Sequence, residues 1–309
     1  KRMRAGMIMI LETWAGRTMG HFPIDRRLFP HGLAGLKAVV ARIHAAGLKA
    51  GLHYLSTGVS ANDRTVTPVP DCRLVEDAAT VLTAALDARQ TDIPCADASR
   101  GFPAALHPRG LYYGNGTDIR IDDELITYET CTTAAPGGFR RCRRGAYGTR
   151  AAPHAKGTPV VHLQRSFGYF LVDLDTSLAG EVAGRIARVV DGCGFDMLYF
   201  DGAEWLQGDH WYYNPRLLLG VYRRLAPRRR NHLHFQASSH THFSWHLVSR
   251  QACADGYRNV RDNVSHASRK YPSFFNNLMP VDIGWYGLGQ ADIAYEDVEC
   301  VLAKSLAWE

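Results

Sequence analysis

The stretch GFDMLYFDGAEW, residues 194–205, decides the fold that the sequence predicts. Residues 197–200 have the near-continuous apolar character of a strand buried on both faces, and Asp201 falls where that strand must end. In a barrel of parallel strands wrapped by helices, polar residues at the carboxyl ends of the strands converge on one pocket. Asp201 is therefore a candidate for chemistry. The alternative interpretation is an aspartate that caps the following helix.

The bulk composition is that of an ordinary globular protein. The chain has 309 residues, of which 46% are hydrophobic and 21% charged. This length suits one barrel of about 250 residues with an insertion. No apolar run approaches the roughly 18 residues that a membrane span needs, and no zinc-finger or RNA-binding signature is present. The sequence therefore predicts neither a membrane nor a nucleic acid as partner.

The basic residues and the cysteines indicate less clearly which partners and which compartment the protein has. The formal net charge is +6, with arginine clusters at residues 140–144 and 223–230. An anionic polysaccharide is thus one candidate partner, although a solvated helix end or hairpin face is the simpler interpretation. The seven cysteines do not follow a disulfide or zinc-ribbon pattern, and only Cys131 and Cys142 are placed to pair, across a predicted hairpin. The compartment is left open, with a secreted or periplasmic location favoured.

The first part of the chain has the pattern of a strand–helix–strand unit. Residues 7–13 are an apolar run ending in polar residues, residues 33–46 carry apolar side chains at helical spacing, and residues 48–55 form the next apolar run. Short connections between such elements imply that the two strands pair in parallel. A weaker helix is predicted over residues 74–88.

The composition then changes to glycine, proline, threonine and short alternating strands. Residues 118–129 alternate apolar and polar side chains, and Gly137 with Gly138 supplies a turn. This pattern predicts a small β module inserted between the two parts of the barrel. Residues 143–163 resemble a small β unit found in phage tail-like proteins, a resemblance that carries no catalytic residue.

Strands and helices alternate again in the last part of the chain. The expected strands are 170–175, 197–201, 233–237, 245–249 and 279–286, and the expected helices are 178–191 and 295–306. Together the elements predict an α/β fold, a (β/α)8 barrel of TIM type that is incomplete at its termini. The predicted division is 1–90 for the first part of the barrel, 91–163 for the inserted β-rich module and 164–309 for the second part.

Two blocks resemble the glycoside hydrolase clan of α-galactosidases, families 27 and 36. Residues 12–52 resemble the family stretch in which a strand-end acid and a tryptophan precede a helix and a Gly-Leu-Lys-x-Gly strand, and residues 170–201 resemble the segment leading to the nucleophile. The resemblance implies that Asp201 is that nucleophile. It is looser to family 31 α-glucosidases and to α-L-fucosidases. The α-galactosidases carry lysine where this chain has Tyr199, which places galactose specificity in question.

Retaining glycosidases use two carboxyl groups about 5 to 5.5 Å apart, one as nucleophile and one as acid and then base. Beside Asp201, the family pattern favours Asp255 as the acid/base, although an Asp-Gly turn is an equal interpretation of that residue. Three other carboxylates compete for the role: Glu12, Glu204 and Asp282.

Sugars are held by aromatic rings and polar side chains, which the predicted strand ends supply. The expected substrate-binding residues are Glu12, Trp14, His53, Glu204, Trp205, Gln236, His240, Asp282 and Trp285. The competing interpretation is that most of the aromatic residues only pack in the core or loops. Histidines 232, 234, 240, 242 and 246 form a cluster that could hold zinc, but hydroxyl contacts suit them equally. The sequence predicts no metal and no cofactor.

The leading hypothesis is a retaining, exo-acting glycoside hydrolase that takes an oligo- or polysaccharide substrate and uses Asp201 and Asp255. A hypothesis from another class is a non-catalytic carbohydrate-binding or virion-associated barrel, motivated by the tail-like insert and the missing lysine. A zinc-dependent hydrolase using the histidine cluster is the third.

Overall fold

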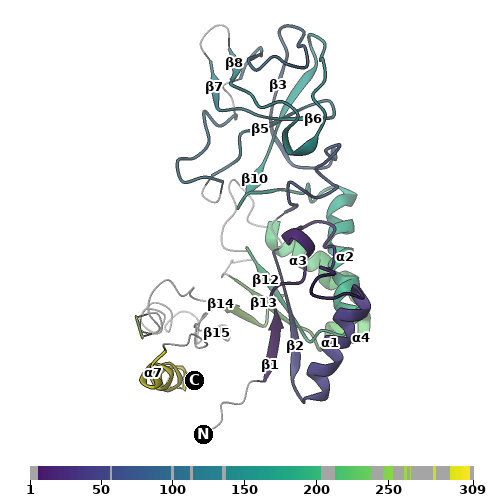
Figure 1. Cartoon of the computed structure of the whole chain (residues 1–309), viewed down its shortest axis with the longest axis vertical. Helices are drawn as coiled ribbons and strands as arrows, with labels where there is room; N and C mark the ends of the chain where they lie inside the picture. Colours follow the sequence, from purple (N-terminus) through teal and green to yellow (C-terminus); the bar gives the residue numbers. More distant parts are fainter. Residues whose placement is uncertain are drawn as a thin grey trace.

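The computed structural model describes residues 6–55, 58–98, 101–111, 114–133, 137–202, 213–238, 246–252, 261–262, 265, 281–282 and 293–306. It consists of a parallel sheet with helices packed on one side, and an antiparallel β module that lies beyond the carboxyl ends of the parallel strands (Figure 1). Among the described helices, none has the length and apolar character needed to cross a bilayer.

The parallel sheet has six strands whose spatial order follows the chain. In order they are β1 (Met7–Ile10), β2 (Lys49–Leu55), β12 (Met197–Asp201), β13 (His234–Ala237), β14 (Arg250–Ala252) and β15 (Val281–Asp282). Every neighbouring pair is parallel. Doubly wound sheets reverse their strand order at a switch point, whereas this order runs in one direction only, as in a barrel.

The predicted α/β class is confirmed, but the predicted closed barrel of eight strands is not what the described residues show. Within them the sheet has six strands, and β1 and β15 at its two edges are not paired with each other. The helices are α1 (Leu33–Ala45), α2 (Ser177–Cys193), α3 (Tyr213–Arg224), α4 (Pro227–Arg230) and α7 (Tyr295–Leu306). Helices α1 to α4 lie together on one side of the sheet (Figure 1).

The main core fills the space between these helices and the sheet. Val40 of α1 and Ile186 of α2 are buried with Leu52 and Leu198 of the two central strands. Apolar residues recur along α2 at the three- and four-residue spacing of one helix face. The helix ends at Gly194, whose φ of 85° is the left-handed conformation that glycine adopts without strain.

The inserted module contains two antiparallel sheets. One has the order β3 (Glu76–Val81), β9 (Pro159–Leu163), β5 (Asp118–Ile121) and β6 (Glu124–Thr127), and the other the order β4 (Ile93–Pro94), β8 (Gly138–Arg140) and β7 (Thr130–Thr132). The module has its own core, which includes Ile93, Ile119 and Phe139. Leu125 and Leu163 belong to the main core instead, so the module is packed firmly onto the rest of the chain.

The helix predicted over residues 74–88 is wrong. Glu76–Val81 forms β3, which pairs antiparallel with β9. The alanine-rich composition favours a helix locally, but cross-strand pairing outweighs intrinsic propensity. Residues 76–81 therefore belong to the module's sheet, while the division of the chain at residues 90 and 163 stays a prediction.

Two predicted strands are also corrected. Of residues 170–175, only Phe170 is in a strand, the short β11 (Tyr169–Phe170), which pairs antiparallel with β10 (Arg165–Ser166) and does not join the parallel sheet. The strand expected at 245–249 begins later, at β14. Cys131 and Cys142, the two cysteines that the sequence places to pair, are both free.

Candidate active site

Asp201 is the last residue of β12, which lies between β2 and β13 in the sheet. Its side chain is 31% exposed. Nε2 of His53 lies 3.0 Å from Oδ2, and the backbone N–H of Gly202 donates to Oδ1 at 2.9 Å. An ionised carboxylate can only accept hydrogen bonds, so with Asp201 in that form the donor of this bond is Nε2 of His53. Both carboxylate oxygens are therefore held in a fixed orientation.

His53, Tyr199 and Gln236 form one row across the three central strands, because they pair in register. Side chains alternate between the two faces of a strand, so Asp201, two residues after Tyr199, lies on the same face as this row. The neighbouring positions, such as Leu198, pack into the core under the helices. The row and Asp201 thus lie on the face opposite the helices, which becomes the inner face if the sheet closes.

An apolar layer lies directly below this polar row. A Cβ atom on Gly51 would lie 3.3 Å from Sδ of Met7 and 3.5 Å from Sδ of Met197, so the two methionines meet over this glycine. Successive inward layers of side chains are the normal filling of a parallel barrel. In this sheet the apolar layer lies on the amino-terminal side of the polar row, and Asp201 lies on the carboxyl-terminal side.

The sequence resemblance pairs Tyr199 with a lysine of the α-galactosidases. Its side chain is 1% exposed. Its ring stacks on the imidazole of His53, with centroids 5.5 Å apart and an angle of 26° between the planes. Tyr199 therefore places an uncharged ring beside His53, and His53 supplies a polar contact to Asp201.

Tyr169 and Arg17 belong to the rim of the site, and the sequence interpretation missed both. Burial raises the pKa of Tyr169; the Arg17 guanidinium opposes this shift, and the Asp201 carboxylate adds to it. A Cβ atom on Gly58 would lie 3.2 Å from Cβ of Tyr169. Leu55, three residues before Gly58, pairs in register with Asp201, so Tyr169 lies at the same edge of the sheet as Asp201. No sequence motif marks Tyr169, since its position depends on a hairpin that follows a long insertion.

Glu12 and Trp14, at the end of the first strand, have different surroundings. Glu12 is exposed and accepts a hydrogen bond from Nη2 of Arg17 at 3.0 Å, so it lies on the same rim. Trp14 is 4% exposed and packs edge-on against Phe22, with ring centroids 5.2 Å apart. A ring buried in this way presents no face to a sugar, so its position gives the predicted stacking role no support.

The remaining candidates are only partly placed. Gln236 is 2% exposed and lies in the row beside Tyr199, and Asp282 pairs with Ala252 between β15 and β14. Five predicted residues lie outside the described part of the chain: Glu204, Trp205, His240, Asp255 and Trp285. Their roles stay predictions.

The described residues contain no group of three or more His, Cys, Asp or Glu side chains placed to hold a metal ion. Of the histidine cluster, His234 is exposed on β13, with Nε2 3.2 Å from Nζ of Lys49. His240 and His242 lie outside the described ranges.

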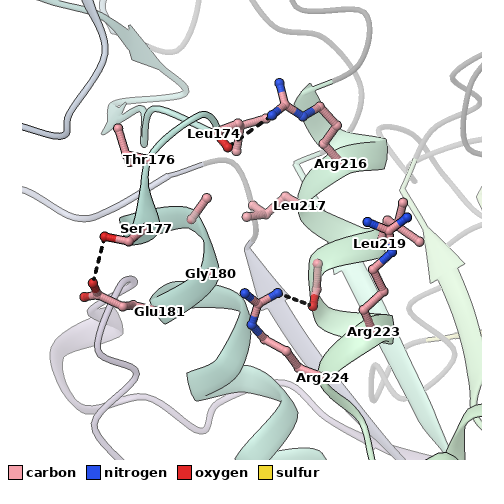
Figure 2. A pocket seen from close by; sticks show the side chains of 12 residues that line it. Leu174, Thr176, Ser177, Gly180, Glu181, Arg216, Leu217, Leu219, Arg223 and Arg224 are labelled. Carbon is pink, nitrogen blue, oxygen red and sulfur yellow. Dashed lines mark hydrogen bonds between the residues drawn. The ribbon is translucent and has the colours of Figure 1, made fainter.

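A pocket of about 510 Å³ lies between α2 and α3, on the helix side of the sheet (Figure 2). Two of its three arginines, Arg216 and Arg224, bond to backbone carbonyls. Arg224 donates to the Gly220 carbonyl at 3.1 Å and lies against Gly180, where a Cβ atom would be 2.4 Å from the guanidinium. Arg216 bonds the Leu174 carbonyl at 3.1 Å. This pocket is separate from the face that carries Asp201, and its polar groups do not converge on a common point.

Comparison with known proteins gives matches among solved structures. No protein-family model and no curated protein matches the chain. An α-galactosidase from Thermus thermophilus, solved in complex with stachyose, is 13% identical and aligns over 98% of this chain and 52% of its own, with a TM-score of 0.55. A GH36 α-galactosidase from Geobacillus stearothermophilus is 11% identical over 98% of this chain and 37% of its own, with a TM-score of 0.48.

A GH27 β-L-arabinopyranosidase from Geobacillus stearothermophilus also matches, at 11% identity over 90% of this chain and 52% of its own, with a TM-score of 0.46. The chain therefore spans about half the length of the Thermus enzyme. Identities this low are evidence for the fold alone. The resemblance to the α-galactosidase families that the sequence indicates is therefore confirmed as a similarity of structure.

Proposed function

We propose that this chain is the catalytic part of a glycoside hydrolase that is retaining and exo-acting, and that its sheet forms most of a (β/α)8 barrel. The observation that carries the proposal is the position of Asp201. It ends a central strand, on the face opposite the helices, and both of its oxygens are held. Strand ends of this kind carry the catalytic groups of barrel enzymes.

In the proposed reaction Asp201 attacks the anomeric carbon of the sugar. The new bond joins a carboxylate oxygen to that carbon while the glycosidic C–O bond breaks, and Asp255 gives its proton to the departing oxygen. A water molecule then attacks the same carbon. Asp255 takes one proton of that water, the bond to Asp201 breaks, and both carboxyl groups return to their starting states with the anomeric configuration retained.

His53 and Gly202 prepare Asp201 for this attack. Their hydrogen bonds fix the plane of the carboxylate before substrate arrives, and a fixed near-attack orientation lowers the entropic cost of the reaction. The stacked ring of Tyr199 in turn restricts the imidazole of His53. The nucleophile is thus supported by residues from two neighbouring strands.

Residue 199 is tyrosine, whereas the α-galactosidases carry a lysine there, so the substrate test should include a broad range of sugars. A lysine at this position would contact substrate hydroxyls, and its replacement by a stacked ring removes that contact. Galactosides are therefore one class among several, and the net positive charge supports including uronides.

The test is a panel of p-nitrophenyl glycosides, followed by the Asp201→Ala variant with added azide. Azide enters the space left by the carboxylate and attacks the anomeric carbon. We expect turnover to be lost and then restored as a glycosyl azide of inverted configuration. Asp196→Asn is a matched control, because Asp196 lies directly before the same strand and bonds His44 and the Ala50 amide. Full activity of Asp201→Ala without azide would contradict the proposal.

The alternative function is a carbohydrate-binding protein without catalysis. Its specific expectation is that sugars bind while no glycoside in the panel is cleaved by the wild type. That combination of results would favour it over the hydrolase.

A further inference from the structure

We propose that the inserted β module is a structural part of the active site, because it fixes the β10–β11 hairpin so that Tyr169 lies beside Asp201 and contacts the bound sugar. The sugar contact rests on the proposed function. The placement of Tyr169 does not, and it can be measured without any substrate.

The hairpin is joined on one side to the loop that follows β2. The Val59 amide donates to the Phe170 carbonyl at 2.8 Å, and the Phe170 amide donates back to Val59 at 2.9 Å. The approach is so close that a Cβ atom on Gly58 would lie 2.2 Å from the Phe170 oxygen. Only glycine fits there. Since β2 also carries His53, this contact sets Tyr169 relative to the residue that holds Asp201.

The hairpin is held on its other side by a buried cluster in the module. Arg165 is 4% exposed, and its Nη1 donates to Oδ2 of Asp118 at 2.9 Å and to the Tyr147 hydroxyl at 2.7 Å. The Tyr147 hydroxyl donates to Oδ1 of Asp118 at 2.8 Å. Asp118 lies on β5 and Tyr147 in the short turn Ala146–Gly148 (η2), so both anchors belong to the module.

Arg165 connects this cluster to the turn of the hairpin. Its Nε donates to the Gly168 carbonyl at 3.1 Å, directly before Tyr169, and its guanidinium lies 4.4 Å from the ring centroid of Phe170. A buried ion pair of this kind contributes little net stability once desolvation is counted, and its best-supported use is to specify one geometry. Here the geometry that it specifies is the turn that carries Tyr169.

The phenol of Tyr169 suits a sugar contact. Its ring is partly buried against the main core. Its Cβ lies 3.2 Å from where a Cβ atom on Gly58 would be, and Gly58 follows Leu55, the register partner of Asp201, by three residues. The charges of Arg17 and Asp201 act on its hydroxyl in keeping with this position. A neutral hydroxyl can donate to or accept from a sugar hydroxyl next to the anomeric carbon. In this arrangement Tyr169 binds the substrate, and Arg165 is a positioning residue that acts through the hairpin.

The placement is tested by replacing Tyr169 with 3-nitrotyrosine, whose phenol ionises nearer neutral pH and changes absorbance when it does. The pKa of this probe is measured in the full chain with Asp201 and with Asp201→Asn. Removing the carboxylate should lower the pKa of the probe by about one unit. The same probe at Tyr295, which is 71% exposed on α7, should not respond. An unchanged pKa at position 169 would overturn the placement.

The role of the module is tested by repeating the pair of measurements in Arg165→Met and Asp118→Asn backgrounds. Comparing the effect of Asp201→Asn across backgrounds cancels the direct charge effect of each module substitution. We expect the response of the probe to shrink by at least half in both, with circular dichroism confirming a folded chain. A response equal to that of the parent would show that the module does not position Tyr169.

The sugar contact is tested with Tyr169→Phe, on the p-nitrophenyl glycoside that the wild type cleaves fastest. Loss of one neutral hydrogen bond should raise KM about five- to tenfold and change kcat less than about twofold. An unaltered KM would overturn the contact. If the wild type cleaves no glycoside, the proposed function and the sugar contact fall together, whereas the pKa of the probe still decides where Tyr169 lies.

Discussion

The parallel sheet and the inserted module use charged residues in opposite ways. In the module, Glu124 is 1% exposed and bonds Arg144 at 2.8 Å and His154 at 2.9 Å, so its charge is fully enclosed by partners. In the sheet, Asp201 is 31% exposed at a strand end and is oriented by His53. The difference in exposure distinguishes a carboxylate that stabilises the fold from one that is accessible to a substrate. An enclosed, paired carboxylate specifies a fold, whereas an oriented and accessible one can react.

The largest effect is expected from Asp201→Asn. The amide keeps the size of the side chain but cannot attack the anomeric carbon, so kcat should fall by at least about a thousandfold. The free energy of unfolding, measured in urea, should change by less than about 1 kcal/mol, because the group is partly exposed. A large loss of stability with activity preserved per folded molecule would place Asp201 with the structural carboxylates of the module.

The reverse pattern is expected from Glu124→Gln. Removing one partner of a buried ion pair should lower the free energy of unfolding by about 3 kcal/mol, with kcat per folded molecule unchanged. The matched control is Asp122→Asn, which removes an exposed partner of the same His154 and should cost less than about 1 kcal/mol. Equal losses from the two variants would contradict the distinction between enclosed and exposed carboxylates.

Glu124 also predicts a pH dependence. Burial alone would raise its pKa, but hydrogen bonds from Arg144, His154 and the amides of Gly145 and Ala152 outweigh that effect and lower the pKa in the folded state. Its contribution is therefore present above the ordinary glutamate pKa of about 4.3 and is lost as pH falls through the lower folded value. Urea midpoints of wild type and Glu124→Gln should converge over that acid range. A constant difference would contradict this assignment.

A smaller catalytic effect is expected from His53→Ala. Without the hydrogen bond to Oδ2, the Asp201 carboxylate can rotate, and kcat should fall by about tenfold to a hundredfold. His53→Gln offers a replacement N–H donor and should retain more activity than the alanine variant. Wild-type kcat in both variants would show that Asp201 needs no orienting partner.

The smallest effect is expected from Glu12→Gln. The ion pair of Glu12 with Arg17 is exposed on both sides, with 59% and 80% of the side chains accessible. The free energy of unfolding should therefore change by less than about 0.5 kcal/mol. A tenfold rise in KM in the same variant would instead mark Glu12 as a substrate contact, as the sequence predicts.

Local pattern was sufficient for the elements that carry the sheet. The apolar spacing of residues 33–46 and 178–191 predicted α1 and α2, and the apolar run ending at Asp201 predicted β12. Local pattern gave the wrong prediction for β3, because its alanine-rich sequence favours a helix. The segment is a strand because it pairs with β9, almost eighty residues later in the chain. Pairing over that sequence distance is a tertiary effect that no local window contains.

In the candidate site too, some residues were predicted from local pattern and others are placed by contacts between distant segments. Asp201, His53 and Gln236 were predicted from a strand end and from polar side chains on predicted strands, and the register of β2, β12 and β13 brings them together. Their roles stay predictions. Tyr169 was missed because the Val59–Phe170 pairing and the Arg165 cluster set its position. Trp14 was expected to face the substrate but lies in the core, since an apolar aromatic residue after a strand has no signal that tells burial from exposure.

The central claim is that Asp201 becomes covalently bonded to the sugar. The most direct measurement treats the protein with a mechanism-based fluoro-sugar inhibitor that carries the same sugar as the glycoside cleaved fastest by the wild type. The labelled protein is then digested with pepsin and analysed by mass spectrometry. We expect the labelled peptide to contain β12 and fragmentation to place the sugar on Asp201. A label on another carboxylate, or turnover that the inhibitor leaves unaffected, would contradict the claim.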